Sequence, residues 1–111
     1  RAAATRGDAP IDATFDQEAR GGRPTWTPHP RVAGGIRVSL ESLAPEARRC
    51  FAAVLEPGVA VTLTVRADGR ATDVVVETTD GRARDCLAAA IRRAVFPISS
   101  RAWRVDYLFQ F

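Results

Sequence analysis

The chain lacks lysine and methionine altogether and has a single histidine among its 111 residues. That residue, His29, stands between two prolines, and no second imidazole is present to complete a metal site. The serines at positions 42, 99 and 100 have no histidine beside them to act as a base. We therefore predict no metal, no cofactor and no enzymatic activity.

Long apolar runs are also absent. No stretch approaches the roughly 18 apolar residues that a membrane-spanning helix needs, and the opening Arg-Ala-Ala-Ala-Thr-Arg lacks the apolar segment of a signal peptide. Because no methionine is available to start translation, we expect the chain to be a segment of a longer protein or a processed form. Any targeting signal or membrane anchor would then lie outside it.

The positive charge comes from arginine alone, since 16 arginines and 13 acidic residues leave a net charge of +3. The arginines are scattered along the chain, and only those at 48–49 and 92–93 are adjacent. Nucleic-acid-binding domains usually concentrate basic side chains on one face and add aromatic residues for stacking. The scattered arginines therefore predict no nucleic-acid binding.

The composition, 46% hydrophobic and 26% charged, is that of one globular domain. Residues 1–35 are rich in glycine, proline and charge and show no regular period, which predicts a linker or a loosely attached arm before a domain over 36–111. At the start of that domain, Ile36, Val38 and Leu40 alternate with polar residues and predict a short extra strand.

Two helical patterns follow. The first begins near Ser42, ends at the Pro-Gly pair 57–58, and carries one apolar face of Leu43, Ala47, Cys50, Phe51, Val54 and Leu55. The second is capped by Asp80, ends before Pro97, and carries an apolar face of Cys86, Leu87, Ala90, Ile91, Ala94 and Val95.

Three segments alternate with the period of a strand. The first and second cover about 59–66 and 70–78 and are joined by Asp68-Gly69, the strongest short hairpin signal. The last covers 103–111 and points five large residues to one side. The order of elements predicts an α+β fold: a three-stranded antiparallel sheet in the order second, first, final, with two helices on one face. The final strand then lies at an edge of the sheet.

Cys50 and Cys86 each fall on the apolar face of one predicted helix. Two helices packed side by side would bring the sulfurs within reach, so we predict a disulfide, shielded from reaction partners and formed in an oxidising compartment. Closing this loop would stabilise the fold by roughly 3.8 kcal/mol in the chain-entropy model. The alternative is two reduced thiols buried as small apolar side chains.

From about Ser42 to its end the chain resembles the C-terminal domain family of TonB-like energy transducers, in particular the AgmX/PglI branch. The resemblance rests on Cys50-Phe51, Pro57-Gly58-Val59, Asp68-Gly69, Cys86, Phe96-Pro97 and the closing aromatic strand 105–111. The branch has proline where Leu108 stands here, so this chain keeps every backbone donor of its final strand.

The resemblance implies a periplasmic domain at the end of a linker anchored in the inner membrane. Such a domain contacts a protein partner in the outer membrane or envelope and passes on force from inner-membrane motor proteins through the region missing here. A partner peptide pairs with the final edge strand in these relatives, which makes Arg104, Asp106, Leu108 and Gln110 the expected outward-facing selectors. The alternatives are a plain solvated face for these four residues, and a structural domain that forms a homodimer edge to edge.

Overall fold

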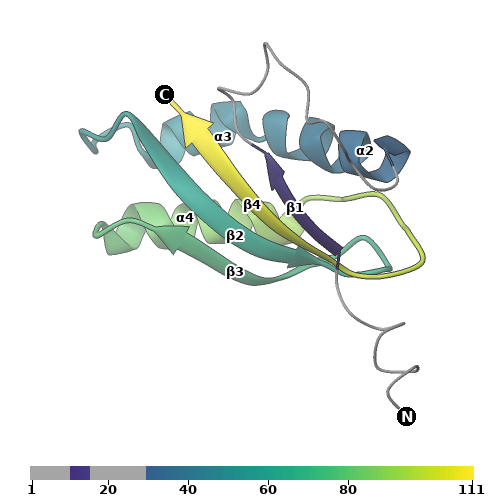
Figure 1. The fold of residues 1–111 in the computed structure, drawn as a ribbon. Helices are drawn as coiled ribbons and strands as arrows, with labels where there is room; N and C mark the ends of the chain where they lie inside the picture. Colours follow the sequence, from purple (N-terminus) through teal and green to yellow (C-terminus); the bar gives the residue numbers. More distant parts are fainter. Residues whose placement is uncertain (1–10, 16–29) are drawn as a thin grey trace.

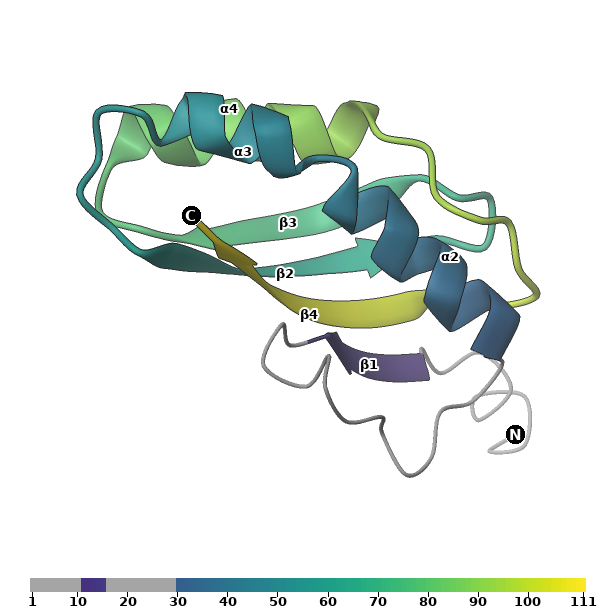
Figure 2. The same ribbon diagram turned by 90° about the horizontal axis from the view of Figure 1, so that it is seen from above.

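The computed structural model describes residues 11–15 and 30–111, in which one four-stranded sheet carries three helices on a single face (Figures 1 and 2). The strand order is β1-β4-β2-β3. The elements in chain order are β1 (Ile11–Phe15), α2 (Pro30–Glu41), α3 (Ala44–Cys50), β2 (Gly58–Val65), β3 (Ala71–Glu77), α4 (Gly81–Arg93) and β4 (Trp103–Gln110).

The predicted α+β fold is confirmed. Strands β3, β2 and β4 are antiparallel neighbours in the predicted order, with the predicted helices over one face (Figure 2). Every second residue of β2 and β4 points to the helices and is buried, because a strand presents alternate side chains to opposite faces. These buried residues are Val59, Val61, Leu63, Val65, Trp103, Val105, Tyr107 and Phe109.

The turn between β2 and β3 forms at the predicted Asp68-Gly69 pair. Gly69 has φ +86°, a backbone conformation that residues with a Cβ rarely adopt. The Asp68 carboxylate accepts a hydrogen bond from the backbone N–H of Arg70 at 3.1 Å and pairs with Arg66 at 3.3 Å. The backbone of Gly69 also lies against the loop after α4, because its carbonyl accepts from the N–H of Phe96 at 3.1 Å.

Helix α4 begins as predicted, since the Asp80 carboxylate accepts a hydrogen bond from the N–H of Ala83 at 2.8 Å. Leu87 and Ile91 are completely buried against the sheet. The helix ends at Arg93, however, so the placement of Val95 on its apolar face was wrong, and Val95 is 84% exposed.

Helix α3 is shorter than predicted. Leu43, Ala47 and Phe51 form its buried face, but the chain leaves the helix after Cys50 in a tight turn, where the N–H of Val54 donates to the carbonyl of Phe51 at 3.0 Å. The assignment of Leu55 to the apolar face was therefore wrong, because the residue lies beyond this turn and is fully exposed.

The short strand predicted at Ile36, Val38 and Leu40 was also wrong, since these residues belong to α2. Ile36 and Leu40 are buried together with Ala33, at helical spacing, whereas Val38 is 63% exposed. Gly35 allows the helix to pack closely, because a Cβ at this position would come within 2.6 Å of the Pro97 ring.

The short N-terminal strand lies instead at β1, inside the segment 1–35 that was expected to be an arm. β1 pairs in parallel with β4, from Ile11 opposite Trp103 to Phe15 opposite Tyr107. The expectation that β4 forms an edge of the sheet was therefore wrong over 103–107, where β4 has neighbours on both sides. Residues 30–35 of the expected arm belong to α2, and its residues 1–10 and 16–29, with His29, lie outside the described residues.

None of the helices in the described part of the chain combines the length and apolar character needed to cross a membrane.

We predict that Gly69→Ala lowers the free energy of unfolding by roughly 1–3 kcal/mol. The new Cβ would force an unfavourable φ and overlap the carbonyl oxygen of Phe96. Gly34→Ala is the matched control, because a Cβ there meets nothing within 4 Å in the middle of α2 and should stabilise by up to about 1 kcal/mol. Urea denaturation of the two variants measures both effects, and equal stability for the two would contradict the prediction.

Candidate functional site

The backbone of β4 is paired unevenly on its two sides. β2 pairs with its whole length, from Gly58 opposite Gln110 to Val65 opposite Trp103. β1 covers the other side only as far as Tyr107. Within the described residues, the stretch 108–110 therefore has a strand neighbour on the β2 side alone, as Figure 1 shows at the end of β4 nearest the C-terminus. Open backbone groups of this kind are the template for strand addition.

The four predicted selectors all point away from the helices. Arg104, Asp106 and Gln110 are exposed, and Leu108 is partly buried. The first two lie within the stretch that β1 covers, whereas Leu108 and Gln110 lie beyond it. The structure thus places these residues on one open face but divides them between the part of β4 that pairs with β1 and the part beyond it.

The open face of the sheet is mixed in character. Opposite Asp106 stands Thr62 of β2, whose Oγ1 donates a hydrogen bond to the Asp106 Oδ1 at 2.9 Å and so fixes the carboxylate in place. Thr62 in turn stands opposite Val75 of β3, which is 53% exposed. A row of apolar, hydroxyl and carboxylate groups therefore crosses three strands on the open face of the sheet.

The uncovered end of β4 is held firmly from the β2 side. The N–H of Phe111 donates to the carbonyl of Pro57 at 2.9 Å. Phe111 stacks on the buried Phe51 ring with centroids 5.2 Å apart, and Tyr107 meets Phe109 edge to face at 4.8 Å. The stretch 108–110, which no described strand pairs with on the β1 side, therefore lies on a fixed strand, and this reduces the entropy that binding would otherwise cost.

The opposite edge of the sheet, on β3, is less regular. Asp73 has φ +52°, and the register of β3 against β2 shifts between Thr62 and Thr64. A bulge of this kind twists an edge and disturbs regular pairing with another strand. The β3 edge is therefore a poorer docking strand than the end of β4.

Two of the three serines considered for catalysis have local structural roles. The Ser42 hydroxyl donates to the carbonyl of Ser39 at 2.7 Å, and the Ser99 hydroxyl donates to the carbonyl of Arg101 at 2.7 Å. Among residues 11–15 and 30–111, no three histidine, cysteine or acidic side chains are grouped as metal ligands would be.

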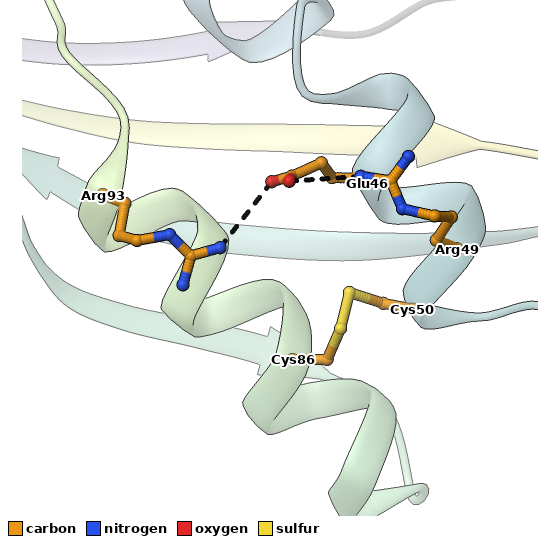
Figure 3. Close-up of polar contacts among 5 residues, drawn as sticks. All are labelled: Glu46, Arg49, Cys50, Cys86 and Arg93. Carbon is orange, nitrogen blue, oxygen red and sulfur yellow. Dashed lines mark hydrogen bonds and ion pairs between the residues drawn. A yellow bond between two sulfur atoms is a disulfide. The ribbon is translucent and has the colours of Figure 1, made fainter.

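The predicted Cys50–Cys86 disulfide is present and joins the end of α3 to α4, with the Cα atoms 5.6 Å apart (Figure 3). It is compatible with an extracytoplasmic location. The expectation that the core shields it was wrong, because Cys86 is exposed and Cys50 only partly buried. The disulfide instead lines a surface hollow between the two helices, together with Glu46, Arg49, Ala90 and Arg93.

Comparison with protein-family models, with curated proteins and with solved structures finds no match to this chain. The resemblance to TonB-like domains therefore rests on the residues of this chain and stays a prediction.

We predict that Ile11→Ala releases β1 from β4. The Ile11 side chain is buried in the core, and its packing holds β1 in place. The backbone N–H of Ile11 also donates to the carbonyl of Ala102 at 2.9 Å, a bond that the substitution keeps. The substitution should cost roughly 2 kcal/mol of packing free energy. The hydrogen-exchange rate of the β4 amides that face β1 would then rise roughly 30-fold. Val38→Ala, at an exposed position of α2, should leave these amides unchanged. Unchanged exchange in both variants would contradict the assignment.

Proposed function

We propose that this chain is a periplasmic, partner-binding domain of a TonB-like envelope energy transducer. In this proposal a peptide from an outer-membrane or envelope protein pairs with β4 by strand addition. The observation that carries the proposal is the uneven pairing of β4, whose fixed backbone continues past the end of β1 without a neighbour on that side in the described residues. The surface disulfide and the closing aromatic strand support it.

The position of β1 gives the proposal a specific mechanism. β1 contacts the rest of the described fold chiefly through β4, so its removal would expose the whole β4 edge and leave the remaining sheet intact. An incoming peptide would begin at the open stretch 108–110 and then replace β1 along 103–107. Because β1 belongs to the same chain, it competes at a high effective concentration and lowers the apparent affinity for the peptide.

The outward side chains supply selectivity in this mechanism. Arg104 and Asp106 have opposite charges two residues apart, and the Asp106 carboxylate is already oriented by Thr62. Leu108 adds an apolar contact that is partly buried before any partner arrives. A peptide with complementary charges and one apolar side chain would match this row.

One prediction of this proposal uses the chain's own β1 as the probe. A synthetic peptide of residues 9–17 should bind the Ile11→Ala variant and shift the amide resonances of residues 102–111. Its affinity for the unaltered chain should be up to roughly 30-fold weaker, because β1 still occupies the site. Equal affinities, or shifts confined to β3, would contradict strand replacement at β4.

Another prediction of this proposal concerns the natural partner. A photo-crosslinking amino acid in place of Gln110, in the parent protein in its own cells, should form an adduct with an outer-membrane or envelope protein. The control places the same crosslinking amino acid at Arg92, an exposed residue of α4, where no such adduct should form. The competing function is an assembly domain that pairs with its own copy, and it predicts adducts of the protein with itself and concentration-dependent sedimentation.

A further inference from the structure

The cysteines lie beside the core rather than in it. Ala47 and Leu87, close to Cys50 and Cys86 in the sequence, are completely buried, whereas Cys86 itself is exposed. The disulfide bridges α3 and α4, which lie next to each other on the sheet (Figure 3), and both cysteines line a hollow between the two helices. A thiolate from solution can therefore approach the disulfide without unfolding the domain, which a core disulfide would not allow.

The charges around the disulfide favour its reduction. Arg49 and Arg93 line the same hollow as the sulfurs, from α3 and α4 respectively. Both guanidinium groups share one carboxylate, that of Glu46, at 3.2 Å and 3.9 Å (Figure 3). The two guanidinium groups therefore exceed this carboxylate by one positive charge in the hollow that the disulfide also lines. This excess charge attracts an incoming thiolate and stabilises the thiolate that leaves.

Contacts other than the disulfide also hold α3 in place. Ala47 and Phe51, on either side of Cys50 in the sequence, are buried in the core. The Glu46–Arg93 ion pair also joins α3 to α4. The reduced form is thus expected to keep its fold, so that reduction and reoxidation can be repeated.

We propose that Cys50–Cys86 is a thiol–disulfide exchange site whose reaction partner is a dithiol. The partner's thiolate attacks the Sγ of Cys86, the more exposed of the two cysteines, and forms a mixed disulfide, and the Cys50–Cys86 bond breaks with its electron pair left on Cys50. The partner's second thiol then attacks the mixed disulfide and releases Cys86 as a thiolate. Both protein thiolates take up protons, the chain gains two electrons, and the partner becomes a disulfide.

The experiment measures reduction of the native protein by dithiothreitol, with thiols trapped by a maleimide and counted by mass spectrometry. The rate should rise in proportion to dithiothreitol concentration and exceed the rate of global unfolding, measured separately in denaturant. The Arg49→Gln/Arg93→Gln variant should be reduced roughly three- to tenfold more slowly at low salt. This difference should fade at high salt, because exposed charges are screened.

Arg92→Gln is the matched control, since this residue is exposed on the same helix but does not line the hollow. It should be reduced at the rate of the unaltered chain. Glutathione, a monothiol, should form its mixed disulfide on Cys86, in the tryptic peptide 85–92, in preference to Cys50 in the peptide 50–66. Reduction only at the rate of unfolding, or equal rates for the double variant and Arg92→Gln, would overturn the proposal.

Discussion

The antiparallel pairing of β2 with β4 is the interaction on which the rest of this fold depends. These two strands bring four pairs of buried side chains into register on one face, and each large apolar side chain contributes roughly 1.5–3 kcal/mol when fully buried. The pairs are Val59 with Phe109, Val61 with Tyr107, Leu63 with Val105 and Val65 with Trp103. The helices pack on this surface, and β1 and β3 attach to its two sides. The candidate binding edge is one side of the same pair.

The elements with a regular period and clear end signals were predictable from the sequence. The β2–β3 turn at Asp68-Gly69, the cap at Asp80 and the alternation of β4 all fit the structure. Helix α2 was not predictable in this way, because Ile36 and Leu40 satisfy both a strand and a helix period. Gly34 and Gly35 favour neither a helix nor a strand. The helix is stabilised at Gly35 by packing against Pro97 rather than by local preference.

The candidate site was predicted in part, for a reason that lies in the topology. Short connections fix the order of β3, β2 and β4, but they give no information about a strand some 90 residues away in the sequence, such as β1. Its only signal is the five-residue alternation of Ile11, Ala13 and Phe15 with polar residues, too short to stand out. The exposure of Cys86 was not predicted, because the apolar face of a helix was treated as buried throughout. In this fold the residues of α4 that face the sheet are buried, whereas Cys86, which faces α3, is exposed.

The disulfide also divides the chain into a covalent ring and two tails. The ring runs from Cys50 to Cys86 and contains the β2–β3 hairpin, whereas β1 and β4 belong to opposite tails that pair with each other. A protease that cuts at the exposed hairpin turn, between Arg66 and Arg70, leaves one covalently connected molecule. A cut between α4 and β4 instead leaves β4, which lies between β1 and β2, attached to the ring by non-covalent contacts alone. In the oxidised domain a single cut therefore leaves the two pieces covalently joined when it falls inside the ring and separates them when it falls outside.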